Sequence, residues 1–279
     1  MKKSRFKPRH DKDEATVGVP CNKVTSMITM GTKEWSDHSV NCCDGCRNNC
    51  RYCFGKGIAI HYGRATEETW QVMKVRWKDV TKSYRKMKGR VMFPTSHDII
   101  DIPEVEEACL TVLGKLLAAG NEVLLTTKPR LSVTRKVCER FSEYQDQIQF
   151  RFTITSCHDE LLKFWEPNAP LFRERMNSLI FAFKKGFKTS VSIEPFLDYD
   201  PVPLVRRVES YSTESVWIGK MNYIAAKGIK ENEKPFYEAI RKGCTLTHLK
   251  EIYSELKGYP KIRFKDSIRN AIARTNNQT

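Results

Sequence analysis

The sequence predicts an α/β fold in the form of a partial (β/α)6 barrel of the TIM type. Six short apolar segments recur along the chain, and stretches with helical periodicity separate them. Strands that alternate with helices of about 10–15 residues are typical of βα units with parallel pairing. Polar residues follow the apolar segments, as expected at the strand ends where such folds carry their chemistry. A doubly wound open sheet is the alternative that the same alternation permits.

The first three expected strands are HSVNCC at 38–43, RVMFPT at 90–95 and EVLLTT at 122–127. Pro103 marks a helix start between the second and third strands, and apolar residues then follow at helical spacing as far as Gly120. Ser132 is of the right type to cap the next helix, which we expect to continue to about Tyr144.

The last three expected strands are QFRFTIT at 149–155, KTSVSIE at 188–194 and SVWIG at 215–219. A helix from about Leu171 ends at Gly186, a residue type common just after a helix. Two further helices are expected near 233–242 and 247–257. We therefore divide the chain into three parts, which are a basic N-terminal arm (1–36), the barrel (37–225) and a helical C-terminal extension (226–279).

The composition is that of a globular protein, with 40% hydrophobic residues. No run of about 18 apolar residues indicates a membrane span, and the charged start MKKSRFKPRHDKDE lacks the apolar segment of a secretory signal. We therefore expect a cytoplasmic, reducing location, where clustered cysteines act as metal ligands or reactive thiols and not as disulfides. The composition predicts no particular oligomeric state.

The formal net charge of +15 favours a polyanionic partner. Basic residues concentrate at 1–12 and 74–90, and the second stretch carries Trp77 and Tyr84 between its cations. Cations interleaved with aromatic side chains suit phosphate contact and base stacking. The charge therefore indicates DNA or RNA as a partner, and a basic protein without such a partner is the alternative.

Five of the ten cysteines lie in the stretch NCCDGCRNNCRYCFGKG. Cys46, Cys50 and Cys53 have the spacing C-x3-C-x2-C, whereas structural zinc usually takes four ligands from two such pairs. Cys42 or Cys43 could add a fourth ligand, although alternation along a strand would point them to opposite faces. Three thiolates in one short loop favour a 4Fe–4S cluster with one iron open to a cofactor or substrate.

The loop GCRNNCRYCFG resembles the motif of radical S-adenosylmethionine (radical SAM) enzymes, C-x3-C-x-aromatic-C, with Tyr52 at the aromatic position. The stretches FPTSHDI, LLTTKPR, FTIT, WEPNAPLFRERM and SVSIEP are similar to the spore photoproduct lyase-like branch, whose members are often labelled DNA repair photolyases. The resemblance covers roughly residues 38–225. It implies a 4Fe–4S cluster and S-adenosyl-L-methionine, which together generate a 5′-deoxyadenosyl radical, and an electron donor such as flavodoxin or ferredoxin.

The resemblance also implies site residues, several of them at the strand ends. It assigns the cluster to Cys46, Cys50 and Cys53, and the adenine contact to Tyr52. The remaining cofactor contacts that it implies are Ser96 and Asp98 for the methionine ammonium, Lys128 for the carboxylate or ribose, Thr155 and Ser156 for the ribose, Arg175 for the methionine carboxylate, and Glu194 for the ribose or for a pair with Arg175.

Some of these residues have an alternative structural role. Asp98 could cap the helix that follows Pro103, Lys128 could be solvated, and Arg175 could lie on a helix surface. His97, between two predicted contacts, is expected to point into the core.

One position departs from the branch. Spore photoproduct lyases carry a cysteine hydrogen donor near the end of the second strand, where this chain has MFPTS. Cys157, after the fourth strand, is the candidate catalytic thiol in its place, although a buried cysteine acting as a small hydrophobic residue is the more ordinary interpretation.

We therefore predict a radical SAM enzyme, a lyase or nucleic-acid-modifying enzyme, that acts on a base or a lesion in DNA or RNA. A peptide or small-molecule substrate is the alternative within this class. A zinc-dependent nucleic-acid-binding module without radical chemistry is the alternative outside it.

Overall fold

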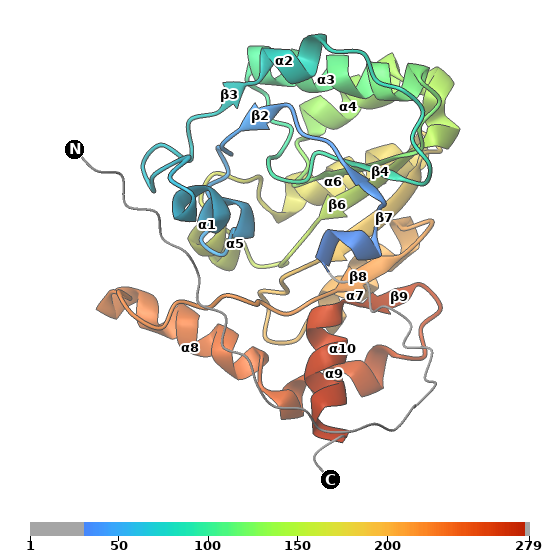
Figure 1. The fold of residues 1–279 in the computed structure, drawn as a ribbon. Helices are drawn as coiled ribbons and strands as arrows, with labels where there is room; N and C mark the ends of the chain where they lie inside the picture. Colours follow the sequence, from blue (N-terminus) through green and yellow to red (C-terminus); the bar gives the residue numbers. More distant parts are fainter. Residues whose placement is uncertain (1–30, 277–279) are drawn as a thin grey trace, which may run out of the picture.

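The computed structural model describes residues 31–276, so most of the expected basic arm, including the stretch 1–12, lies outside the described residues. A parallel sheet forms the centre of the molecule (Figure 1). Its strands, in spatial order, are β1 (His38–Ser39), β4 (Val91–Phe93), β5 (Val123–Thr127), β6 (Ile148–Thr153), β7 (Lys188–Ile193), β8 (Val216–Ile218) and β9 (Ile262–Phe264).

The sheet order follows the chain order, as in a barrel built from successive βα units. Every neighbouring pair runs parallel, from His38 opposite Val91 at one edge to Ile218 opposite Phe264 at the other. Within the described part of the chain, β1 and β9 each pair with one neighbour, so the barrel is open. The predicted α/β class and partial barrel are confirmed.

The strands form because their apolar residues are buried on both faces of the sheet. Phe93, Leu125 and Phe150, from three adjacent strands, are all buried, which is the pattern of parallel strands covered by helices. The covering helices are α3 (Pro103–Ala118), α4 (Leu131–Arg140), α6 (Phe172–Lys184) and α7 (Val202–Val208). Their apolar stripes join the strands in one core, to which α3 adds Leu113 and Leu116.

The segment expected as the first strand divides in two. β1 ends at Ser39, and β2 (Cys43–Asp44) pairs with β3 (Lys74–Val75) in a separate antiparallel ribbon. The chain leaves the sheet at Asn41, whose Oδ1 accepts the backbone N–H groups of Thr95 (2.7 Å) and Ser96 (2.8 Å). This amide ties the start of the cysteine loop to the end of β4.

Two expected helix boundaries are confirmed and one is wrong. Pro103 is the first residue of α3, and Gly186 follows α6 with φ +81°. Ser132 does not cap α4, because the helix begins one residue earlier with Arg130 as its N-cap. The helix ends at Arg140, and a short 3-10 segment (Ser142–Gln147) continues toward β6.

The C-terminal segment contains the two expected helices, α8 (Lys234–Gly243) and α9 (Leu246–Leu256). It also contains β9 and α10 (Asp266–Asn276), which the sequence did not predict. β9 extends the sheet, so this segment contributes a strand as well as helices. Lys265 Nζ, directly after β9, lies 2.7 Å from Glu34 Oε2, which joins this end of the chain to the first described residues.

None of the described helices has the length and apolar character that a membrane crossing requires.

Candidate active site at the carboxyl ends of the strands

Contacts with neighbouring backbone groups fix the conformation of the cysteine loop. Gly45 has φ +79°, and a Cβ at this position would lie 2.6 Å from Trp70 O, so only glycine fits. The next residue, Cys46, donates its N–H to the same Trp70 oxygen at 2.9 Å. Cys53 is the N-cap of α1 (Phe54–His61), and its Sγ accepts the Lys56 N–H at 3.3 Å. The loop therefore starts and ends at fixed anchors.

The three predicted cluster ligands fit a metal centre that holds thiolates. Cys46 and Cys50 are buried and Cys53 is partly exposed. Burial raises the pKa of Cys46 to about 12 and the pKa of Cys50 well above its usual value. Ionisation of these thiols therefore needs a strong positive charge close by, which a metal centre supplies.

The three sulfurs are not gathered as closely as the ligands of a single zinc ion. Zinc bonds of about 2.3 Å in tetrahedral geometry bring sulfurs to within ~3.8 Å of one another. Among the described residues, the groups of three or more ligand atoms that lie within 4.8 Å of one another do not include Cys46, Cys50 and Cys53.

Asp98, after β4, connects the cysteine loop to the end of β5. Its Oδ2 accepts Asn48 Nδ2 at 2.6 Å, and its Oδ1 accepts Thr127 Oγ1 at 2.9 Å and the Lys128 N–H at 2.6 Å. Cys46 Sγ lies 4.0 Å from Oδ2. The N-cap of α3 is Ile102, without a side-chain hydrogen bond, so the capping role is excluded.

Glu166 gathers three of the predicted contact residues around one buried carboxylate. It accepts hydrogen bonds from the Tyr52 hydroxyl, from Thr155 Oγ1 at 2.8 Å, and from Arg175 Nη2. The side chains of Glu166 and Arg175 are both 0% exposed. Burial alone would raise the pKa of Glu166, but the positive charges of Arg175 and Lys128 outweigh the effect of burial and lower this pKa below its usual value.

Glu166 was absent from the sequence-predicted site. The stretch WEPNAPLFRERM contains it, but a glutamate that follows α5 (Asp159–Trp165) looks exposed by residue type. Its position nine residues before Arg175, within the same stretch, was the signal that could have suggested it as the partner of that arginine. The pairing also corrects two expectations. Arg175 is not on the protein surface, and its carboxylate partner is Glu166 and not Glu194.

Lys128 points toward the same site and is half-buried, so it is not a freely solvated side chain. Its Nζ lies 5.7 Å from the centre of the Tyr52 ring. Burial alone would lower the pKa of Lys128, but neighbouring acidic groups, led by Cys50, outweigh it and raise the pKa well above the ordinary value. The ammonium is therefore held in its charged form beside the cysteine loop.

Thr155 and Ser156 form hydrogen bonds with two different carboxylates. Thr155 bonds to Glu166, whereas Ser156 Oγ donates to Asp198 Oδ1. Asp198, after β7, also accepts the Cys157 N–H at 3.1 Å. His158 Nδ1 lies 3.0 Å from Asp198 and 3.7 Å from Cys157 Sγ. Thiol, imidazole and carboxylate thus meet at the end of β6.

Ser96, His97 and Glu194 lie outside the Glu166 network. Ser96 is exposed, and its carbonyl oxygen lies 3.6 Å from where a Cβ on Gly55 would be, so it faces the start of α1. His97 points into the core as expected. Glu194, after β7, packs over Gly219, and burial raises its pKa to about 7.

The open parallel barrel and the cysteine loop at the carboxyl ends of its strands define the architecture of a radical SAM enzyme. The model of the radical SAM superfamily matches residues 40–199, and the chain belongs to this superfamily. It is therefore an enzyme of the radical SAM type, whose cofactors are a 4Fe–4S cluster and S-adenosyl-L-methionine. None of the curated proteins compared with the sequence matches it.

Solved structures with a similar fold include spore photoproduct lyase. A double mutant with bound AdoMet and dinucleoside spore photoproduct is 13% identical with a TM-score of 0.52, and the match covers 86% of this chain and 80% of that one. A tyrosine-to-phenylalanine mutant of the lyase is 14% identical with a TM-score of 0.51, covering 91% and 77%. At this identity the similarity shows the fold.

Proposed function

We propose that this radical SAM enzyme acts on a base or a lesion in a nucleic acid, and that Cys46, Cys50 and Cys53 hold its cluster. The ligand assignment rests chiefly on one observation. The three cysteines lie on a loop whose surroundings, at the ends of β4, β5 and β6, are Asp98, Lys128 and the Tyr52–Glu166 pair. That is the edge of a parallel barrel at which such folds carry their chemistry.

When bound, the cluster and S-adenosylmethionine supply a 5′-deoxyadenosyl radical that abstracts hydrogen from the substrate. The side chains of this chain orient the cofactor and exclude water. Lys128 offers a fixed positive charge for the methionine carboxylate or the ribose, Asp98 a carboxylate for the ammonium, and Ser96 and Ser156 further polar contacts. Tyr52 presents its ring for the adenine, while its hydroxyl is held by Glu166.

Arg175 fits a positioning role better than direct contact. Its guanidinium donates to Glu166, to Pro170 O at 2.7 Å and to Thr153 O at 3.3 Å, so its donors are already occupied by the protein. Through Glu166 it fixes Tyr52 and Thr155. Glu194 stays a proposed ribose contact from the end of β7.

A nucleic acid substrate is supported by an exposed aromatic pair beside the loop. Phe54, which follows Cys53, is 60% exposed and Tyr223 is 66% exposed, and their rings stack at 5.6 Å. Such faces are stacking platforms for unpaired bases. The net charge of +15 acts in the same direction. One of the structurally similar lyases carries a bound dinucleoside lesion.

Cys157 is our candidate hydrogen donor. It is partly buried at the end of β6, and burial together with Asp198 raises its pKa. The sulfur therefore keeps its hydrogen near neutral pH, as a thiol hydrogen donor requires. A flavodoxin or ferredoxin as the reductant, and a reducing cytoplasmic location, stay predictions of the same proposal.

Anaerobic incubation with dithionite, S-adenosylmethionine and oligonucleotides that carry defined lesions or modified bases tests the proposal. Mass spectrometry should detect 5′-deoxyadenosine and an oligonucleotide of changed mass. The Cys157→Ala variant should make 5′-deoxyadenosine but less of the repaired or modified product, whereas Cys244→Ala, at another partly buried thiol, should match the unmodified enzyme. Turnover of peptides or small molecules with no reaction on any oligonucleotide would refute the nucleic acid assignment.

A further inference from the structure

Four buried side chains near the start of the cysteine loop form a second cluster of potential metal ligands. They are Cys42, Cys43, His97 and Cys109, and their ligand atoms all lie within 4.8 Å of one another. They come from three places in the fold, namely the start of β2, the segment after β4 and the middle of α3. None of them belongs to the C-x3-C-x2-C set.

The sulfur separations match a single tetrahedral ion. Cys42 Sγ lies 3.6 Å from Cys109 Sγ and 4.0 Å from Cys43 Sγ. Zinc–sulfur bonds of about 2.3 Å place sulfurs ~3.8 Å apart. The expectation that Cys42 and Cys43 point to opposite faces is wrong, because β2 begins only at Cys43 and Cys42 lies outside a regular strand.

The imidazole of His97 has the tautomer that a metal ligand needs. Its Nδ1 lies 3.2 Å from the carbonyl oxygen of Asp98, and its Nε2 faces the backbone N–H groups of Cys42 (3.2 Å) and Cys43 (3.3 Å). Nε2 is therefore the unprotonated nitrogen, and Nδ1–H is held by a backbone carbonyl, as in most metal-ligating histidines. When Nε2 binds a metal ion, its two hydrogen bonds from the Cys42 and Cys43 N–H groups are replaced by one bond to the metal.

We propose that Cys42, Cys43, Cys109 and His97 bind one Zn²⁺ in a structural Cys3His site that is separate from the iron–sulfur cluster. Three thiolates and one Zn²⁺ leave a net charge of −1. Arg76, whose backbone N–H donates to Cys42 O at 2.8 Å, is a neighbouring cation, and its guanidinium also pairs with Asp44 and Asp79. The ion joins the base of the cysteine loop to α3 and to the end of β4. Buried cysteines that act only as small hydrophobic residues are the alternative.

The test uses the full chain without its cluster ligands, so it does not depend on the proposed reaction. The Cys46→Ala/Cys50→Ala/Cys53→Ala variant is incubated with zinc sulfate, desalted and analysed for metal. We expect about one zinc per chain, as a closed four-ligand site takes. Adding Cys109→Ala should remove this zinc. Adding Cys138→Ala, at a buried free cysteine of the same core, should not.

Cobalt provides a second readout. Co²⁺ in place of zinc should give thiolate-to-metal charge-transfer bands and the visible bands of a tetrahedral site, and Cys109→Ala should abolish both. Circular dichroism checks that the variants fold, and Cys43→Ser replaces Cys109→Ala if that chain does not. The proposal is overturned by a chain that retains no zinc, by zinc that survives both substitutions, or by iron and sulfide in this site in place of zinc.

Discussion

Glu166 illustrates how a single side chain organises residues that the sequence predicted separately. Tyr52, Thr155 and Arg175 were each expected as direct cofactor contacts, and all three bond to this carboxylate. The place of Thr155 after a strand could be predicted, because strand ends follow from the hydrophobic pattern, whereas Tyr52 and Arg175 were expected from the resemblance alone. Their common partner could not be predicted, because whether a glutamate is buried depends on which chain segments fold over it.

Changing Glu166 to Gln tests this organisation. The amide keeps the shape and one acceptor but leaves the buried Arg175 guanidinium without its counter-charge, which costs about 3–5 kcal/mol in comparable sites. We expect a loss of this size in the free energy of unfolding, measured by urea denaturation. Glu160→Gln on the exposed side of α5 serves as control and should change stability by under ~0.5 kcal/mol. Equal effects of the two changes would contradict the network.

Glu194 predicts a pH dependence of stability. Its pKa is raised from 4.5 to about 7, with burial as the main cause, so the folded chain keeps a proton that the unfolded chain releases. Stability from this group is present below about pH 4.5 and is lost as the pH rises through about 7.

The Glu194→Gln variant should lack that loss, which is on the order of 2–3 kcal/mol between pH 4.5 and 8 for a shift of this size. Urea denaturation at several pH values measures it. Glu214→Gln, at an exposed carboxylate before β8, should leave the pH profile unchanged. A Glu194→Gln profile parallel to that of the unmodified chain would show that Glu194 titrates normally.

At the scale of elements, the strands were the predictable part. β5, β6, β7 and β8 contain clustered or alternating apolar residues, and each lies within two residues of its expected position. β9 was missed because its sequence, IRF, is short and sits between lysines. The short helices α1, α2 (Trp77–Thr81) and α5 were missed because they are held by contacts with other segments and have little periodicity of their own.

Gly45 is the element-scale test of the cysteine loop. Alanine there must avoid the Trp70 and Val72 carbonyl oxygens, 2.6 and 2.7 Å from its Cβ, in a left-handed backbone conformation. We expect the loop to shift and Gly45→Ala to lose most of its iron after anaerobic reconstitution. Gly57→Ala in α1, where a Cβ meets no atom within 4 Å, should keep its iron and gain up to about 1 kcal/mol in helix stability. Full iron in Gly45→Ala would disprove the anchoring role.

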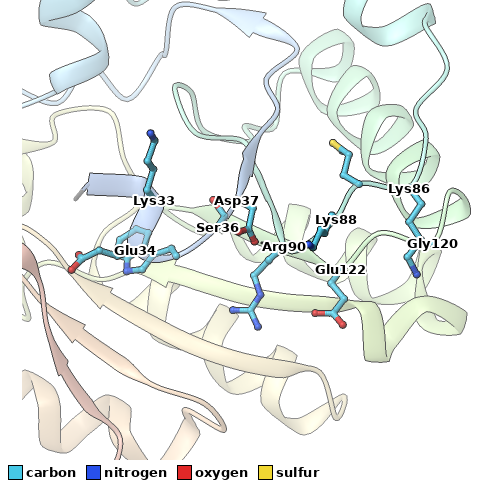
Figure 2. Close-up of a pocket in the computed structure, with 12 residues that line it drawn as sticks. Lys33, Glu34, Ser36, Asp37, Lys86, Lys88, Arg90, Gly120 and Glu122 are labelled. Atoms are coloured by element: carbon cyan, nitrogen blue, oxygen red, sulfur yellow. Dashed lines mark hydrogen bonds between the residues drawn. The ribbon is translucent and has the colours of Figure 1, made fainter. Parts of the chain in front are cut away.

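At the scale of the whole molecule, the cations of residues 86–90 and the proposed site lie at opposite ends of the barrel. Residues 86–90 precede β4 and line a cavity of about 640 Å³ at the amino ends of the strands. Figure 2 shows that the cations there alternate with acids, namely Lys33, Lys88 and Arg90 with Glu34, Asp37 and Glu122. Tyr84, expected to be free for stacking, is partly buried and donates its hydroxyl to Asp79 O at 2.9 Å.

The cations at the amino ends of the strands can contact only phosphates that extend beyond the site, whereas the Phe54–Tyr223 pair lies beside the cysteine loop. Charge and stacking should therefore separate in binding experiments. Changing Lys82, Arg85, Lys86 and Lys88 to Gln should weaken nucleic acid binding equally for unrelated sequences and flatten the slope of log affinity against log salt by about one unit per lost phosphate contact. Phe54→Ala/Tyr223→Ala should weaken binding by about 1–3 kcal/mol per stacked base, with little change in slope. Anisotropy titrations at three salt concentrations measure both.

The control for this experiment removes as many positive charges from another surface. Lys184, Lys242, Lys250 and Lys257 are exposed and are changed together to Gln. If this control has the same effect as the first set, only the net charge matters. If the unmodified chain binds neither DNA nor RNA at low salt, the nucleic acid substrate is excluded.

The central claim is that Cys46, Cys50 and Cys53 hold the cluster of this radical SAM enzyme. Iron and sulfide analysis after anaerobic reconstitution, read together with 5′-deoxyadenosine formation, tests it most directly. We predict about four irons per chain, loss of cofactor cleavage on changing any one of the three to Ala, and normal values for Cys138→Ala. Iron near zero in the unmodified chain, or full iron and cleavage in the triple variant, would contradict the claim.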